Sequence, residues 1–378
     1  MKRSSRRLSI AVAGMMMVWL ISAALAANQA AAVPGQQMSE AAFKNVTALK
    51  GIPVDEFMGT MGLFSAALSV CCGDCHTGAG TSNPKWEDDP PRKRIARRMV
   101  EMVNVINRDN FNGRQVVTCW TCHRGHLRPL ITPTIDAIYS APVIEPDDVL
   151  VRATSGVSSV DEIFARYIQA VGGAAKIASL TSWVGKGTAA GYGEVRTGSP
   201  FELYARPNQL ATIIHQREDD LARTYDGQNA YVQLPLTVVE QYPLTAGALE
   251  GAKLDAQLTF PGRIKDALTN WRASYPSTID DKEVDVVQGT GASGLIATFY
   301  FDKQSGLLVR MVRYANSTVG RVPTQIDYSD YRDVAGVKLP FKWTFGWVGG
   351  RDEFTMTEAQ PNVPIDATRF ARPVPRRR

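Results

Sequence analysis

The chain has 378 residues, 44% of them hydrophobic and 21% charged, with a formal net charge of +5. This length allows a targeting segment and two domains that each bury a core. Four of the basic residues lie within the first seven positions, and without them the charge falls to about +1, so we do not expect nucleic acid as a partner.

The N-terminus has the pattern of an export signal. A basic start, Met1 to Arg7, is followed by a mostly apolar run from Leu8 to Ala26, with small residues at Ala24 and Ala26. This pattern predicts a signal peptide over residues 1–26 and a periplasmic or other extracytoplasmic location. The run is also long enough for the alternative, an uncleaved N-terminal membrane anchor.

Cysteine and histidine are concentrated in two short segments. The chain has five cysteines and four histidines, and two C-x-x-C-H pentapeptides, at residues 72–76 and 119–123, use four of those cysteines and two of those histidines. This pentapeptide is the attachment pattern of a c-type haem, in which two thiols form thioethers with the porphyrin and the histidine ligates the iron. We therefore predict two covalent haems c, attached through Cys72, Cys75, Cys119 and Cys122, with His76 and His123 as iron ligands.

Other uses of these thiols fit the pattern less well. A thioredoxin-like redox pair needs a βαβ context, and a four-thiolate zinc site does not require a histidine directly after each second cysteine. Cys71, immediately before the first motif, has no evident partner. It stays open as a free thiol, an intermolecular disulfide or a small buried residue.

A helix that carries methionine is expected before each motif. The first lies between Pro53 and Val70 and the second runs from Arg94 to Asn107, and their apolar stripes contain Phe57, Met61, Phe64 and Leu68, and Ile95, Met99, Met102 and Ile106. His126 is too close to His123 to reach the opposite face of its haem, and His215 is far away in the sequence. Methionine is therefore the expected second axial ligand. Spacing alone does not choose between Met58 and Met61, nor between Met99 and Met102.

Residues 40–128 resemble the cytochrome c subunit of photosynthetic reaction centres. The likeness is carried by VTALKGIP at 46–53, EFMGTM at 56–61, IARRMVEMVNVIN at 95–107 and VTCWTCHRG at 117–125. The resemblance implies that Met61 and Met99 are the methionine ligands. Photosynthetic members of the family bind four haems, whereas this chain has two motifs and no histidine between Asn107 and Thr118. It is similar to a two-haem relative, and a photosynthetic role is not implied.

Two basic segments are candidates for contact with anions. One is Pro91 to Arg98 and the other is Arg376 to Arg378. Beside a haem we expect such residues to face propionates or a redox partner protein, although a solvated surface is the alternative.

The second half of the chain is expected to be rich in antiparallel strands. After a Pro-rich linker at 129–155 and a helix from Val160 that ends before Gly172, alternating patterns predict strands at 201–205, 211–215, 221–225, 230–233, 295–301, 307–314, 325–331, 338–347 and 353–358. Such strands suit a curved sheet or half barrel. The predicted fold is multidomain: a small α-helical cytochrome c domain at 40–128, then an antiparallel β-rich (α+β) domain at 156–372.

Residues 160–372 resemble, more weakly, the lipoprotein-carrier fold of LolA- and LolB-type proteins. YDGQNAYV and SGLLVRMVRY carry this likeness. No catalytic triad is evident, because His215 is the only histidine of this half and is expected to be a satisfied strand residue. The acidic pairs Asp219-Asp220 and Asp280-Asp281 are expected in solvated turns.

The patterns together predict an exported dihaem cytochrome that transfers single electrons between redox protein partners and is not an enzyme. The alternative is an extracytoplasmic binding or sensing module, whose β domain holds an apolar or membrane-derived ligand, with membrane association. A haem enzyme would require an open position at the iron.

Overall fold

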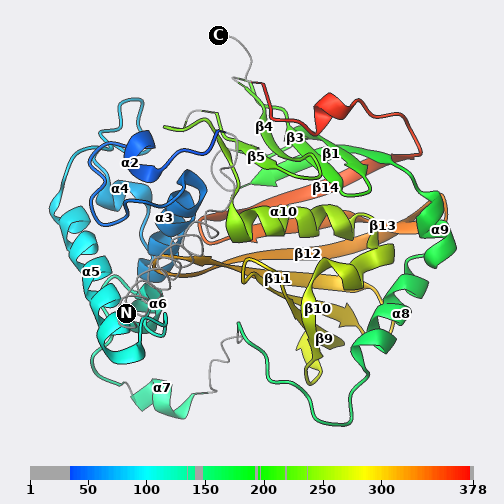
Figure 1. Cartoon of the computed structure of the whole chain (residues 1–378), viewed down its shortest axis with the longest axis horizontal. Coiled ribbons are helices and arrows are strands. Elements are labelled where there is room, and N and C mark those ends of the chain that lie inside the picture. Colours follow the sequence, from blue (N-terminus) through cyan, green and yellow to red (C-terminus); the bar gives the residue numbers. More distant parts are fainter. Residues whose placement is uncertain are drawn as a thin grey trace, which may run out of the picture. The chain divides into compact units, whose positions relative to one another are not determined.

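The computed structural model describes residues 35–133, 135–140, 148–191, 195, 197–217, 219–235 and 237–374. The predicted signal peptide at 1–26 and the basic residues Arg376 to Arg378 lie outside these residues. From Gln37 onward the described chain forms one compact unit, in which helices come first and an antiparallel sheet follows (Figure 1).

The N-terminal part of this unit is helical. It contains α2 (Ser39–Ala42), α3 (Val54–Leu68), α4 (Cys72–Cys75), α5 (Pro91–Phe111), α6 (Cys119–His123) and α7 (Ile135–Tyr139). Both long helices occur where the sequence predicts them, and α5 extends beyond the predicted Arg94–Asn107 at both ends. Pro91 suits the first helical position, because an N–H group there would have no partner within the helix. At the other end, Asn112 has a left-handed backbone conformation, with φ 54°, and ends the helix.

The buried face of α3 is displaced by one position from the predicted apolar stripe. Val54, Leu63 and Ala67 are buried, whereas Met61 is half-buried. The same holds for α5, where Val100 and Val103 are buried and the predicted stripe is more exposed. Both stripes therefore retain accessible apolar surface.

The rest of the chain forms one large sheet with helices beside it. The helices are α8 (Val160–Ala170), α9 (Ala174–Ser179), α10 (Ala246–Leu258) and the 3₁₀ turns η1 (Pro261–Ala267) and η2 (Ala367–Arg369). The strands are β1 (Trp183–Gly191), β2 (Ser199–Arg206), β3 (Gln209–Ile214), β4 (Leu221–Tyr225), β5 (Ala230–Gln233), β6 (Gln241–Pro243), β7 (Thr269–Ala273), β8 (Ser277–Ile279), β9 (Lys282–Thr290), β10 (Ile296–Asp302), β11 (Leu308–Ser317), β12 (Gly320–Val334), β13 (Val337–Trp347) and β14 (Gly350–Pro361).

The sheet is antiparallel and is not closed. Its order is β6-β5-β4-β3-β2-β1-β14-β13-β12-β11-β10-β9-β7, with β8 paired to β9. The first and last strands of this order, β6 and β7, do not pair with each other in the described chain. The predicted fold class, a helical region followed by an open antiparallel β-rich region, is confirmed.

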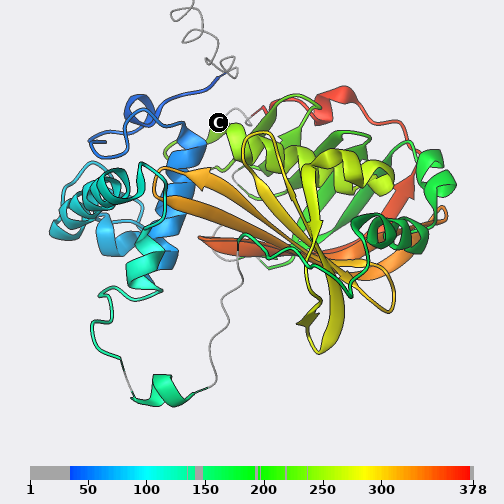
Figure 2. The same ribbon diagram turned by 60° about the horizontal axis from the view of Figure 1, so that its bottom comes forward.

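Helix α10 shows that the sheet is curved. It contacts β3, β4 and β5 and also β11, although β2, β1, β14, β13 and β12 lie between these two groups in the sheet order. One helix is only about 10 Å wide, so the sheet must bend around it to reach both of its sides. Figure 2 shows α10 lying across the strands.

Strand β1 was not predicted because its sequence, WVGKGTAAG, is rich in glycine. A Cβ atom on Gly187 would lie 2.1 Å from the backbone oxygen of Thr355 on β14, and the register shifts between Lys186 and Gly187. Glycine inside a strand often marks such a bulge or close backbone approach. The glycines that weaken the strand pattern in the sequence are therefore needed for the close packing of β1 against β14.

The start of α3 is bonded to the sheet region at two places. The carboxylate of Asp55 accepts hydrogen bonds from the backbone N–H (2.6 Å) and hydroxyl (2.9 Å) of Thr245, directly before α10. The carboxylate of Glu56 accepts them from the N–H (2.8 Å) and hydroxyl (2.7 Å) of Thr318, between β11 and β12. Gly62 allows a close approach, because a Cβ atom there would lie 2.7 Å from a methyl group of Val348.

The end of the predicted linker lies along the sheet. Asp148 forms an ion pair with Arg321 on β12, and the N–H of Ala153 donates to the carbonyl of Ala273 on β7 at 3.0 Å. Residues 148–153 are thus held by the strands, and the linker over 129–155 and the domain boundaries stay predictions.

No described helix has both the length and the apolar character needed to cross a bilayer.

Replacing Asp55 with Asn tests the electrostatics of the junction between α3 and α10. Burial raises the pKa of Asp55 above its ordinary value of 3.8, against the opposing effect of the bonds from Thr245. A carboxyl group with a raised folded-state pKa takes up its proton first in the folded chain. The wild type should therefore gain stability relative to Asp55→Asn as the pH falls through the folded-state pKa, and the gain should level off below the unfolded-state value.

Urea unfolding of both proteins between about pH 7 and pH 4 measures this difference. Asp88→Asn, which removes an exposed carboxyl group, is the matched control. The same pH dependence in both variants would show that burial of Asp55 has no special effect.

Candidate functional site

The first C-x-x-C-H motif forms a single helical turn that is closed by its own residues. The backbone N–H of Cys71 donates to the Asp74 carboxylate at 3.0 Å, and the Cys71 thiol donates to the same oxygen at 3.2 Å. Arg92 on α5 forms an ion pair with Asp74 at 2.6 Å. The hydrogen bonds from Cys71, followed by Arg92, lower the pKa of Asp74. The turn thus places Cys72 and Cys75 three residues apart on a helix.

Cys71 is therefore part of the motif's local structure. It lies at the N-terminal cap of α4 and is exposed, so the expectation of a small buried residue is wrong. Its thiol belongs to the capping arrangement with Asp74.

The second motif has the same local construction. Thr118 is the N-terminal cap of α6. Its N–H donates to the hydroxyl of Thr121 at 3.0 Å, and the N–H of Thr121 donates to the hydroxyl of Thr118 at 3.4 Å. This reciprocal pair is a capping box. In both motifs the residue before the second cysteine closes the turn.

Asn107 on α5 holds the segment that leads into the second motif. Its side-chain oxygen accepts from the N–H groups of Val116 (3.0 Å) and Val117 (2.9 Å), and its amide donates to the carbonyl of Val117 at 2.7 Å. Asn107 is 6% exposed, so these bonds are partly shielded from solvent. The role of Asn107 is not evident from the sequence, because polar residues near helix ends are common and spacing does not show which loop such a residue binds.

His123 is oriented by a backbone carbonyl. Its Nδ1 lies 2.9 Å from the carbonyl oxygen of His126, so Nδ1–H donates there and Nε2 keeps its lone pair. Metal-ligating histidines commonly donate their other ring nitrogen in this way. His126 thus contributes its backbone rather than its ring.

His76 has an unpaired ring nitrogen. Its Nδ1 is buried and has no hydrogen-bond partner among the described residues. The ring of Trp86 lies 5.2 Å from the imidazole in an edge arrangement, and Lys93 holds the carbonyl of Trp86 at 2.7 Å. Burial, followed by the charge of Lys93, lowers the pKa of His76, which favours the neutral imidazole that binds metals.

The structure separates the two methionines of α3. Met58 packs against Val54, Val232 and Tyr242, a cluster shared with the sheet. Met61 instead packs against the cluster of Leu49, Ile52, Leu63, Val100 and Val319, against which Cys119 also packs. Met61 therefore faces the part of the chain that carries the motifs, and Met58 faces the strands.

The apolar stripe of α5 is open to solvent along much of its length. Ile95 is 46% exposed and Met102 is 44% exposed, while Met99, between them on the same face, is half-buried. Exposed apolar side chains in a row indicate a surface that a further group covers. Helix α5 packs against both α4 and α6, so this stripe belongs to the helix that supports both motifs.

The alternative uses of the cysteines receive no support from the thiol chemistry. Burial raises the pKa of the Cys75 and Cys119 thiols, whereas reactive redox cysteines have a lowered pKa. In the part of the chain that the structure describes, no three His, Cys, Asp or Glu side chains come close enough to bind a metal ion. The two cysteine pairs are thus not assembled into one four-thiolate site.

These residues fit two attached haems. Each motif presents two thiols and a histidine on one helical turn, His123 keeps Nε2 available, and the buried Nδ1 of His76 lacks a partner. An accessible apolar stripe on α5 lies next to both turns. The donor set of thiols, imidazoles and thioethers is that of haem c.

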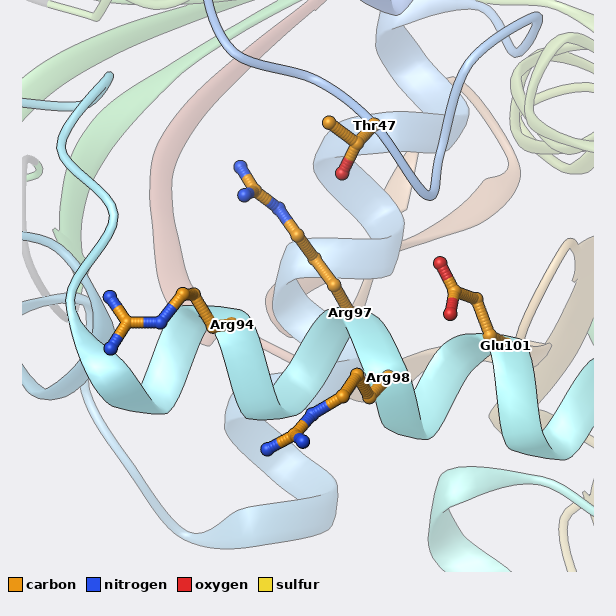
Figure 3. Close-up of a pocket in the computed structure, with 5 residues that line it drawn as sticks. All are labelled: Thr47, Arg94, Arg97, Arg98 and Glu101. Carbon is orange, nitrogen blue, oxygen red and sulfur yellow. The ribbon is translucent and has the colours of Figure 1, made fainter.

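A basic hollow lies beside the first turns of α5. A cavity of about 400 Å³ is lined by Thr47, Arg94, Arg97, Arg98 and Glu101 (Figure 3). Arg97 extends toward the segment that carries Thr47 and forms an ion pair with Asp89 at 2.6 Å. Arg98 is exposed and has no ion pair within the described residues, so its charge is available to an anion.

The concave side of the sheet holds charged residues. Arg313 on β11 forms a partly buried ion pair with Asp255 on α10, and the guanidinium of Arg223 on β4 lies 4.1 Å from the centre of the Phe345 ring on β13. Burial raises the pKa of Asp255 and of Asp352 nearby. An interior of this kind does not favour a purely apolar ligand there.

The remaining sequence candidates lie away from the motifs. His215 follows β3, with Nδ1 3.2 Å from Asp220 and Nε2 3.7 Å from Glu202, which agrees with a satisfied residue. Asp280 and Asp281 form the turn between β8 and β9, as expected for a solvated acidic pair. For the other acidic pair this expectation is wrong at Asp219, which is 7% exposed.

Asn107→Leu tests whether the loop before the second motif depends on this clamp. The variant keeps the branched shape of the side chain, but the N–H of Val117 loses its acceptor and that of Val116 keeps only the carbonyl of Arg114 at 3.0 Å, so the free energy of unfolding should fall by about 1–3 kcal/mol. Denaturant unfolding measures it. Asn104→Leu, at an exposed position of the same helix, should change stability by no more than about 0.5 kcal/mol. Equal losses would assign the effect to leucine in the helix rather than to the clamp.

Two families match separate parts of the chain. Residues 14–137 match the family described as photosynthetic reaction centre cytochrome C subunit. Residues 233–359 match a family of unknown function, DUF6544.

Two curated relatives show the similarity of the first part. The photosynthetic reaction center cytochrome c subunit of Roseobacter denitrificans is 31% identical over 150 residues, which are 36% of this chain and 40% of the relative. The subunit of Thermochromatium tepidum is 36% identical over 99 residues, 25% of this chain and 23% of the relative. The chain therefore spans less than half the length of these relatives.

Solved structures resemble the second part. A LolA superfamily protein from Nitrosomonas europaea is 11% identical and covers 57% of this chain and 99% of its own, with a TM-score of 0.37. A likeness at this score carries no argument about function. The resemblance to reaction centre cytochrome c subunits is confirmed for the N-terminal part of the chain, over residues 14–137.

Proposed function

We propose that this chain is an exported electron-transfer protein with two covalently attached haems c. The observation that carries this proposal is the pair of C-x-x-C-H turns, each closed by a reciprocal cap, within the part that resembles reaction centre cytochrome c subunits. Cys72 and Cys75 would hold one haem and Cys119 and Cys122 the other. Bound in this way, a haem supplies a one-electron couple between ferric and ferrous iron.

The chain's own residues would provide the axial ligands. His76 and His123 would each offer an imidazole to the iron, and the thioethers of Met61 and Met99 would supply the second ligand of each haem. Met61 packs against the same cluster as Cys119, which supports it as the ligand over Met58. The side chain of Met58 packs against the strand residues Val232 and Tyr242. Met99 follows from the resemblance and from its half-buried place on the stripe. A thioether ligand raises the reduction potential relative to a second histidine, which suits a carrier at the oxidising end of a chain.

The basic surface of α5 would bring a partner to this region. Arg94 and Arg98 are exposed, and they line the hollow close to the turn that Arg92 anchors. Exposed cations beside a redox site attract anionic groups and accelerate association with an acidic partner. We therefore expect an acidic redox protein, with electron transfer and no chemical transformation of a substrate. Export through the predicted signal at 1–26 would place the protein where covalent haem is attached.

The haem content can be measured directly. We expect that the protein, exported from a host competent in cytochrome c maturation, keeps a mass increase of two haems after denaturation. The double variant Cys119→Ser/Cys122→Ser should keep one, because each motif forms its own two thioethers. Intact-mass spectrometry with haem staining measures both. A wild-type protein without any mass increase would overturn the proposed function.

The methionine ligands can be assigned with paired variants. Met61→Ala and Met99→Ala should each remove about half of the far-red charge-transfer band of the ferric protein, since each abolishes one of two thioether ligations. Met58→Ala and Met102→Ala are the matched controls and should keep the band. Loss of the band in a control variant and its retention in the partner variant would reassign that ligand.

A further inference from the structure

The turn between β11 and β12 reaches into the helical part of the chain. Residues 317–320 form this turn, and its first residue, Ser317, accepts a hydrogen bond through its carbonyl from the side chain of Gln115 at 2.9 Å. Thr318 donates both its N–H and its hydroxyl to Glu56 at the start of α3. The turn is thus bonded to α3 and to the loop before the second motif.

The next residue of the turn, Val319, enters the cluster that lies between the motifs. It is fully buried and packs with Leu63 of α3 and Val100 of α5. Met61 and Cys119 pack against the same cluster. One side chain of the sheet therefore shares its packing with a proposed ligand of the first haem and with an attachment residue of the second.

Gly320 allows the turn to come this close. A Cβ atom there would lie 3.1 Å from Leu63 Cδ2 and 3.4 Å from Thr118 Cβ, and its φ of +153° is one that other residues rarely adopt. Thr118 caps the helix of the second motif. The backbone of the turn thus lies directly against the start of that helix.

We propose that the β11–β12 turn is a wall shared by the two haem sites, with Val319 as a positioning residue for Met61 and Cys119. This inference rests on the proposed function and deepens it. The buried isopropyl group keeps the Met61 thioether in one packed orientation and excludes water from that side of the ligand. The sheet region then tunes the redox site instead of only carrying it, because the environment of a metal ligand sets its binding strength and potential.

The test compares two buried valines of the sheet. Val319→Ala opens a cavity in the shared cluster, whereas Val287→Ala opens one in the main core of the sheet, where Val287 is also fully buried. In the Met99→Ala background only the Met61 band remains. In that background, Val319→Ala should weaken or shift the Met61 band and lower the reduction potential of the corresponding haem. Val319→Ile, which fills the same space, should keep the band, and Val287→Ala should leave it unchanged.

The possible results separate this inference from the proposed function. Intact mass is measured first, and a protein without haem would overturn the proposed function itself. Two attached haems with the same Met61 band in Val319→Ala and Val287→Ala would overturn the role of the turn alone. If Val319→Ala does not fold, Glu56→Ala removes the two bonds from Thr318 and frees the turn without opening a cavity. An unchanged band and potential in that variant would also refute the proposal.

Discussion

Two adjacent carboxylates at the start of α3 hold the helical part of the chain against the sheet. Asp55 accepts from Thr245, and Glu56 accepts from Thr318, so the same helical turn is bonded to α10 and to the β11–β12 turn. These bonds set both the position and the rotation of α3. Residues three apart on a helix lie on neighbouring faces, so the rotation decides that Met58 meets Val232 and Tyr242 and that Met61 meets the cluster of Val100 and Val319.

The geometry of the two motifs depends on local hydrogen bonds and on contacts with α5. The side chains of Asp74 and Thr121 each accept a hydrogen bond from the backbone N–H of the residue before the first cysteine. Six consecutive residues therefore fix the spacing of the thiols and the histidine in each motif. Where each turn lies depends on α5, through the ion pair of Arg92 and the buried amide of Asn107. A single long helix therefore supports both sites.

The sheet region acts as the body on which this arrangement is built. Its strands bend around α10, and the ion pair between Arg313 and Asp255 joins that helix to the concave face. This largely shielded pair helps to hold α10 and hence Thr245 in place. The contacts that position α3 thus continue through α10 to Arg313 on β11.

Features that depend on neighbouring residues can be predicted from the sequence alone. Two C-x-x-C-H motifs, the helices before them and strands such as Leu221–Tyr225 and Ala230–Gln233 follow from short patterns, since caps, turns and side-chain alternation act over a few positions. Tertiary contacts placed Met58 and Met61 in different clusters, brought Asn107 and Val319 to the motifs, and formed β1 despite its glycines. These features depend on contacts between residues far apart in the chain, such as Glu56 with Thr318, and no local spacing records which distant side chains will meet.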